Sequence, residues 1–179
     1  MTVRRRATIV LLLATLLVAS GSYVYAQFGV LRGEQGDTPE FPPPQMPDAL
    51  LAPCRILYTS VRREANGAGW RTDYPWGERH LMTRLSELTK TRVSLLEPEV
   101  PHAWLVRLTD EALFQCPFLV ASDVGTIGLS QEEADRLHDY LLKGGFLWVD
   151  DFWGEAAWSQ WSKEIAKAFP PSEFPIQDV

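Results

Sequence analysis

Strand-like and helix-like patterns alternate along the chain after Cys54, and this alternation constrains the fold more than any other feature. Strand-like apolar runs occupy residues 55–61, 92–96, 118–122 and 146–149. Helical patterns occupy residues 76–90, 130–143 and 157–169. Strands that alternate with helices pair in parallel, because each helical crossover returns the chain to the same end of the sheet. We therefore predict an α/β fold with a doubly wound, mostly parallel sheet, for which a flavodoxin-like strand order of 2-1-3-4 is the simplest arrangement.

Local signals define two of the helical segments more closely. Ser130 and Glu133 have the spacing of a capping box, in which each side chain accepts a hydrogen bond from the other residue's backbone amide. Gly144 suits the left-handed turn that ends a helix. Between the second and third strands, residues 109–114 predict one or two helical turns.

Apolar patterning also predicts burial. The runs at 118–122 and 146–149 are continuous rather than alternating, which indicates strands buried on both faces. Trp158 and Trp161 recur at helical spacing, so we expect both in the core rather than at a ligand.

The first 26 residues have the composition of a secretory signal. A basic cluster at Arg4–Arg6 precedes an apolar run at residues 7–19, and a small-residue triplet ends at Ala26, after which we expect cleavage. An uncleaved anchor is the alternative, since residues 7–25 could just span a bilayer. Both alternatives predict export to a periplasmic or other extracytoplasmic location, with membrane contact only through this segment if it is not cleaved.

A proline-rich segment at residues 27–53 separates the signal from the α/β domain, which we place at residues 54–179. Pro42, Pro43 and Pro44 favour an extended chain, so this segment reads as a tether. The alternative is an ordered strap whose apolar residues dock on the domain. The candidate docking residues are Phe41, Met46, Leu50 and Leu51.

The charge distribution excludes one class of partner. The cluster Arg4–Arg6 lies in the signal, so 14 of the 17 basic residues and all 23 acidic residues follow it. A domain with this excess of acidic groups is a poor binder of polyanions, and we expect no nucleic-acid partner.

Three loops follow predicted strands and meet at the carboxyl edge of the sheet, where open parallel sheets bind ligands. These loops are residues 66–75, 123–128 and 150–154. They bring together four carboxylates, three aromatic residues and a glycine as candidate ligand-binding residues: Asp73, Asp123, Asp150, Asp151, Trp70, Tyr74, Trp153 and Gly125.

Carboxylates beside aromatic rings suit a sugar, whose hydroxyl groups donate to the carboxylates while its ring stacks on the aromatic face. The same carboxylates could instead hold a divalent cation or form an acid and base pair. A structural alternative also stays open, because an aspartate at a strand end commonly caps the next helix or shapes a turn.

Motifs for nucleophilic, zinc and nucleotide chemistry are missing from the sequence. No Gly-x-Ser-x-Gly or cysteine elbow follows a strand, and His80, His102 and His138 have no zinc-ligand spacing. There is also no glycine-rich phosphate loop with Lys and Ser/Thr. We therefore predict no catalytic residues, no metal site and no cofactor.

Cys54 and Cys116 each precede a predicted strand, and the two strands are neighbours in the expected order. Adjacent parallel strands lie about 4.8 Å apart, within reach of a disulfide, and an exported protein meets an oxidising compartment. A disulfide and two separate buried thiols are the alternatives.

Several motifs resemble a bacterial family known as domain of unknown function 4159. The resemblance covers residues 55–171 and is strongest over Gly144–Gly154, with further motifs at residues 69–75, 106–109 and 122–126. It implies a class I glutamine-amidotransferase-like fold in exported or membrane-anchored proteins, with no established activity. An amidotransferase would carry its cysteine after the third strand, where this chain has Asp123. The family pattern also continues past Val179, which predicts that part of the domain lies beyond this sequence.

Together these features predict an exported, non-catalytic module of the cell envelope that binds a small ligand, a glycan or a partner protein. The alternative is a hydrolase of a glycan or related envelope substrate that uses carboxylates or a metal. Its candidate residues are Asp73, Asp123, Asp150 and Asp151. Two carboxyl groups about 5 to 10 Å apart across a cleft would favour the hydrolase, and carboxylates engaged in helix caps would favour the binding module.

Overall fold

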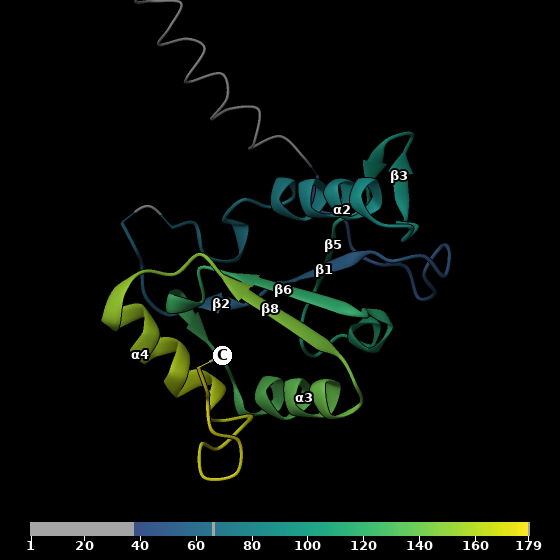
Figure 1. The fold of residues 1–179 in the computed structure, drawn as a ribbon. Helices are drawn as coiled ribbons and strands as arrows, with labels where there is room; N and C mark the ends of the chain where they lie inside the picture. Colours follow the sequence, from purple (N-terminus) through teal and green to yellow (C-terminus); the bar gives the residue numbers. More distant parts are fainter. Residues whose placement is uncertain (1–37, 66, 179) are drawn as a thin grey trace, which may run out of the picture. The chain divides into compact units, whose positions relative to one another are not determined.

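The computed structural model describes residues 38–65 and 67–178, which contain a four-stranded, all-parallel sheet (Figure 1). The strands are β1 (Pro53–Ile56), β5 (Trp104–Val106), β6 (Phe118–Ser122) and β8 (Phe146–Asp150). They lie in the order β5-β1-β6-β8, which is 2-1-3-4 when these four strands are counted along the chain. The predicted α/β fold is confirmed, whereas the predicted signal at residues 1–26 lies outside the described residues.

The second strand of this sheet is not the one that the sequence predicted. Residues 92–96 instead contribute to β3 (Leu95–Glu97), which pairs antiparallel with β4 (Val100–Pro101) in a separate ribbon. Its apolar side chains are exposed, whereas every residue of β5 is buried beside β1. Strand β5 joins the main sheet because its side chains are buried against the core. Its three residues are too few to show a strand period in the sequence.

The predicted first strand also differs, because its second half leaves the main sheet. Residues 59–60 form β2 (Thr59–Ser60), which pairs antiparallel with β7 (Ile127–Gly128). Short 3-10 helices at Gly69–Arg71, Glu111–Gln115 and Val124–Thr126 connect the strands. The second of these helices lies where the sequence predicted one or two turns.

Within the described residues, three α-helices pack around the sheet: α2 (Trp76–Leu88), α3 (Gln131–Leu142) and α4 (Gly154–Ile165). The predicted capping box of α3 is present, with the Glu133 amide donating to Ser130 Oγ at 3.2 Å and the Ser130 amide donating to Glu133 Oε2 at 2.8 Å. Gly144 follows α3 with φ of 96°, as expected for a glycine that ends a helix.

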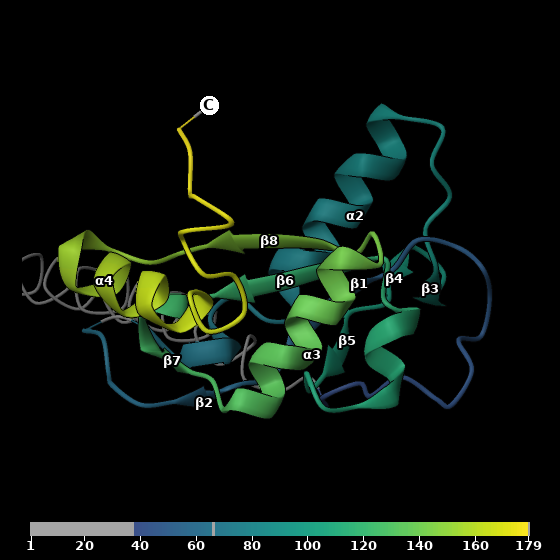
Figure 2. The same cartoon turned by 90° about the horizontal axis from the view of Figure 1, so that it is seen from below.

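The two faces of the sheet have different coverings (Figure 2). Arg55, Val120 and Trp148 are aligned across β1, β6 and β8, and this face is the one on which α2 packs. The neighbouring positions, including Leu119 and Leu147, point into the main core with α3 and α4. Figure 2 shows α2 on one side of the strands and α3 on the other.

Two burial predictions are wrong in part. Strand β8 is not buried on both faces, because it is the last strand of the sheet, and Phe146 and Trp148 are exposed on it. Trp161 is in the core as predicted, but Trp158 is 45% exposed and stacks on Phe152 at the protein surface. Helical spacing identified one apolar face of α4, but this face is wider than the core that covers it.

The described part of the proline-rich segment, residues 38–53, lies against the α/β domain. The Leu105 amide donates to the Glu40 carbonyl at 2.6 Å, and the Met46 amide donates to Gln115 Oε1 at 3.2 Å. Ser94 Oγ donates to Asp48 Oδ2 at 2.9 Å. For these residues the contacts agree with the ordered strap, and residues 27–37 lie outside the described residues.

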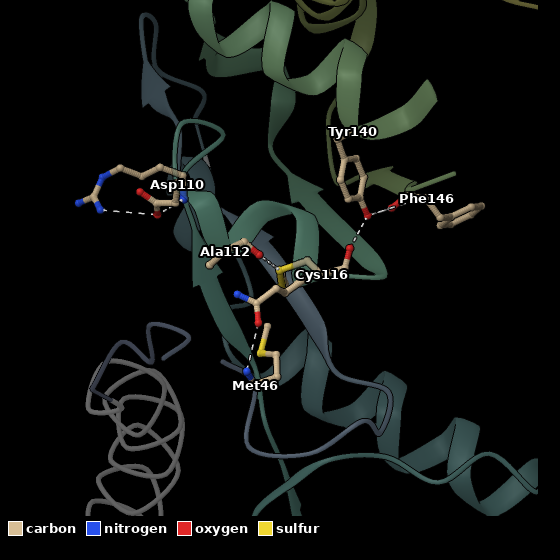
Figure 3. The surroundings of a disulfide bond; sticks show 9 residues. Met46, Asp110, Ala112, Cys116, Tyr140 and Phe146 are labelled. Carbon is tan, nitrogen blue, oxygen red and sulfur yellow. Dashed lines mark hydrogen bonds and ion pairs between the residues drawn. A yellow bond between two sulfur atoms is a disulfide. The ribbon is translucent and has the colours of Figure 1, made fainter. Parts of the chain in front are cut away.

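A disulfide joins Cys54 in β1 to Cys116, which precedes β6, with a Cα–Cα distance of 5.9 Å. Figure 3 shows its surroundings, where the Tyr140 hydroxyl donates to the Cys116 carbonyl at 2.8 Å. The Phe146 amide donates to the same hydroxyl at 3.2 Å. These bonds attach α3 to the beginning of β6 and β8, next to the disulfide.

None of the helices within residues 38–65 and 67–178 is long and apolar enough to cross a membrane.

Candidate functional site

A cavity of about 370 Å³ opens beside the carboxyl ends of the strands, and we call it the crevice. Three of the predicted ligand-binding residues line it: Asp123, Asp151 and Trp153. Its other lining residues are Arg62, Arg63, Glu64, Ala65, Gly67 and Thr72. The charged residues at 62–64 were missed from the sequence, although they come directly after the first strand region, where a site at this edge should be sought.

Asp123 is the most deeply buried acid of the crevice, at 1% exposure. It follows β6 in the left-handed conformation, with φ of 53°. Its Oδ2 accepts a hydrogen bond from the Gly69 amide at 2.8 Å, and its Oδ1 has no hydrogen-bond partner among the described residues. Burial raises the pKa of Asp123, the Gly69 amide lowers it, and the nearby charges of Glu64 and Asp151 raise it further.

Two glycines let the crevice carboxyl groups approach the backbone. A Cβ atom on Gly67 would lie 2.2 Å from Asp123 Oδ2. A Cβ atom on Gly125 would lie 2.4 Å from Glu64 Oε1 and 2.5 Å from the Cβ of Ala157 in α4. All three distances are shorter than real contacts, so larger residues would displace the carboxyl groups and, at position 125, would also collide with Ala157. Gly125, a predicted site residue, therefore leaves room for the Glu64 side chain but does not itself line the crevice.

Arg62 holds the loop after the first strand region in place. Its Nη1 donates to the Gly125 carbonyl at 2.7 Å and to Glu64 Oε1 at 2.5 Å. Trp153 is 78% exposed at the rim, and its side chain forms a hydrogen bond with Asp151, which leaves the faces of the ring open to a ligand. The crevice thus combines an arginine pair, buried and half-buried carboxyl groups and one exposed aromatic ring.

Asp151 also lines the crevice, and it is in the left-handed conformation with φ of 55°. Burial raises the pKa of Asp151, and the charges of Asp73 and Asp150 raise it further, whereas the hydrogen bond from Trp153 and the charge of Arg55 lower it. Asp73 is also left-handed, with φ of 59°. Non-glycine residues rarely adopt this conformation, and such strain is concentrated at functional sites.

The remaining predicted acids, Asp73 and Asp150, do not line the crevice. They line a second cavity of about 160 Å³ together with Arg55 and Glu78. Strand β8 ends at Asp150, and Asp151 follows it in a left-handed conformation, so the single predicted cluster is divided between two cavities. Ser122 Oγ donates to Asp150 Oδ1 at 2.7 Å, which places Asp150 on the α2 side with the second cavity.

Two predicted aromatic residues pack in the protein instead of facing a ligand. The Tyr74 hydroxyl donates to the Ala103 carbonyl at 2.7 Å, and burial raises the pKa of Tyr74 to about 12. Trp70 contacts Tyr74 edge-on, with ring centroids 5.9 Å apart, and is packed against the core. Their position in a loop suggested a ligand platform, but the loop folds back onto the sheet.

The four aspartates are not engaged in helix caps. The N-cap residue of α2 is Pro75 and that of α4 is Trp153, and the Asp123 side chain makes no capping bond to its own 3-10 helix. In the part of the chain that the structure describes, no group of three or more His, Cys, Asp or Glu residues could hold a metal ion.

Comparison with known proteins identifies the family. Neither the curated proteins nor the solved structures contain a match to this chain. A family model described as domain of unknown function (DUF4159) matches residues 56–178, which include every lining residue of the crevice and every lining residue of the second cavity except Arg55. The chain therefore belongs to the DUF4159 family.

Proposed function

We propose that this protein is a non-catalytic binding module of the bacterial cell envelope that holds a polyhydroxylated ligand, such as a glycan, in the crevice. The observation that carries the proposal is the Oδ1 atom of Asp123, which is buried in the crevice wall without a hydrogen-bond partner among the described residues. A buried acceptor without a donor costs about 1 to 3 kcal/mol, and a ligand hydroxyl would recover that free energy.

The other crevice residues suit the same ligand class. Trp153 presents an exposed indole ring at the rim, on which the apolar face of a sugar can stack. Arg62 and Arg63 supply donors for ligand oxygens, whereas Asp123 and Asp151 supply acceptors. This mixture of donors, acceptors and one aromatic ring matches a neutral polyol better than a strongly charged ligand.

A hydrolase is the second candidate function, supported by the two acids that share the crevice. Burial raises the pKa of both Asp123 and Asp151, as is required of a carboxyl group that donates a proton. Retaining and inverting glycosidases use such pairs of carboxyl groups. The binding module is preferred because Asp123 stands where an amidotransferase would carry its cysteine nucleophile, and because its Oδ2 already accepts a hydrogen bond from the Gly69 amide.

The proposal includes export and a finer fold class. Residues 1–26 have the composition of a secretory signal or anchor, which would place the domain in the periplasm or another extracytoplasmic compartment. The disulfide between Cys54 and Cys116 is compatible with such a compartment. The strand order is compatible with a flavodoxin-like sheet of the class I glutamine-amidotransferase type.

Binding is tested by titrating the full-length protein with soluble chito-, malto- and xylo-oligosaccharides and following Trp indole signals by NMR. We expect saturable binding of at least one oligosaccharide, weakened at least tenfold in Asp123→Asn and in Trp153→Ala. Trp158→Ala is the matched control, since Trp158 is also exposed but does not line the crevice.

Two results would contradict the binding proposal. The first is the absence of saturable binding across the panel, and the second is a loss of thermal stability in Trp153→Ala that parallels the loss of binding. Release of new reducing ends by the wild type, abolished in Asp123→Asn, would favour the hydrolase.

A further inference from the structure

We propose that the second cavity, which we call the α2 cavity, is a separate binding site for an organic cation and takes the ammonium group of an alkylamine. Its lining includes Arg55, Glu78, Asp73, Asp150 and Trp148. It shares no lining residue with the crevice, so the inference does not depend on the proposed glycan binding.

The α2 cavity lies where helix α2 meets the sheet. Glu78 comes from the first turns of α2, and Arg55 and Trp148 come from β1 and β8. Asp73 precedes α2, and Asp150 is the last residue of β8. Segments far apart in the sequence thus supply the walls, which is characteristic of a formed site rather than of a local turn.

Carboxylates outnumber cations in this lining. Glu78, Asp73 and Asp150 are opposed only by the Arg55 guanidinium. Arg55 is 1% exposed, and its donors are directed to Glu78 Oε1, the Trp70 carbonyl at 3.2 Å and the Thr72 carbonyl at 2.9 Å. The guanidinium is therefore largely occupied by the protein, and the excess of negative charge remains.

Glu78 supplies the independent observation that points to a ligand. Its side chain is 0% exposed, and Oε1 is paired with Arg55. Oε2 has no hydrogen-bond partner among the described residues. A buried carboxylate oxygen without a donor is costly, so a donor from outside the chain would stabilise this arrangement.

An alkylammonium ion meets these requirements. Its nitrogen has three donors for the carboxylate oxygens. Trp148 is 48% exposed at the cavity, so its ring can contact the cation or its methylene groups. A cavity of about 160 Å³ accepts a short aliphatic amine, such as the end of a lysine side chain, but is too small for a larger ligand.

The test uses n-butylammonium chloride and n-butanol as probes of equal length, added to the full-length protein at constant ionic strength. The readout is the indole N–H signal of Trp148 in 1H–15N spectra, assigned by its loss in Trp148→Phe. We expect a saturable shift with butylammonium and none with butanol. This comparison uses the wild type alone, so it is independent of how any variant folds.

Two variants then test whether the carboxylates of the α2 cavity bind the ammonium group. Asp73→Asn and Asp150→Asn should each weaken butylammonium binding about fivefold. Asparagine tolerates the left-handed backbone of Asp73 and can still accept the Ser122 bond at position 150. The controls are Asp123→Asn in the crevice and Asp135→Asn on the exposed surface of α3, and both should bind as the wild type does.

The proposal is overturned if butylammonium gives no saturable shift, if butanol gives the same shift, or if both cavity variants keep wild-type affinity. Loss of glycan binding in the crevice would leave these results unchanged, so failure of one proposal can be distinguished from failure of the other.

Discussion

Asp150 and Asp151 are consecutive in the chain but line different cavities. Asp150 accepts a hydrogen bond from Ser122 Oγ at 2.7 Å and lines the α2 cavity, whereas Asp151 lines the crevice with Asp123. Strand β8 ends at Asp150, and the left-handed backbone of Asp151, with φ of 55°, turns the chain between the two carboxylates. Two consecutive aspartates therefore line two different cavities.

Replacing Asp123 with asparagine should stabilise the protein at neutral pH. Burial raises the pKa of Asp123 above its ordinary value of 3.8, so the folded state binds this proton more tightly than the unfolded state does. The charged form consequently destabilises the fold above the raised pKa, and this cost disappears as the pH falls to 3.8. Asp123→Asn should gain about 1 kcal/mol at pH 7.5 by urea unfolding, with the gain decreasing towards pH 4.

The matched control for this effect is Asp135→Asn, because Asp135 is exposed on α3. Its stability relative to wild type should vary little across the same pH range. An Asp123→Asn protein that is less stable than the wild type at pH 7.5 would show that the charged carboxylate is favourable in the fold.

Breaking the buried ion pair of Arg55 and Glu78 should be strongly destabilising. Both side chains are almost fully buried, so Arg55→Met leaves the Glu78 carboxylate without its counter-charge. Removal of one partner of such a pair costs about 3 to 5 kcal/mol. Urea unfolding of Arg84→Met provides the comparison, since the exposed Arg84–Glu87 pair should contribute less than about 0.5 kcal/mol. Similar losses in the two variants would contradict the assigned role of Arg55.

The disulfide should contribute substantially to stability. Cys54 and Cys116 are separated by 62 residues, and closing a loop of this length removes chain entropy worth about 4 kcal/mol from the unfolded state. The double variant Cys54→Ala/Cys116→Ala should therefore lose roughly this much free energy of unfolding, as measured by urea denaturation. A reductant should destabilise the wild type but leave the double variant unchanged.

Mass analysis after alkylation without reductant checks the bond directly. The full-length protein should gain no label without reductant and two labels after reduction. Two labelled thiols in the untreated protein would mean that Cys54 and Cys116 are not bonded to each other.

Removing the charge of Glu40 should loosen the strap. Glu40 Oε1 accepts from Arg79 Nη2 at 2.8 Å, and Oε2 lies 2.9 Å from His102 Nδ1. Charge-assisted hydrogen bonds contribute about 1.5 to 3 kcal/mol, so Glu40→Gln should lose stability on that scale. Hydrogen exchange of the Leu105 amide, which donates to the Glu40 carbonyl, should become faster. Glu97→Gln, at an exposed carboxylate, should leave this exchange rate unaltered.

Local sequence patterns predicted the order of most elements. The strand at residues 118–122 and the capping box of Ser130 and Glu133 lie where they were expected, because both depend on a few neighbouring residues. Strand β5 was missed, since its three residues are too few to show a period. Trp158 was misplaced because spacing identifies an apolar face but does not show how far the core extends over it.

The sequence predicted only some of the residues that line the crevice. Asp123, Asp151 and Trp153 were expected together and do line one cavity. Arg62 and Glu64 were missed, because charged residues after a strand have the same appearance as an ordinary solvated loop.

The sequence by itself determined which elements alternate and which acids end the strands, because hydrophobic periodicity and turn residues act over short distances. Only the tertiary structure decided how those acids are distributed. The left-handed turn at Asp151 separates it from Asp150, and packing of α2 brings Glu78 to Arg55, 23 residues earlier in the chain. Contacts of this range depend on burial and charge pairing in the assembled core, which no local pattern encodes.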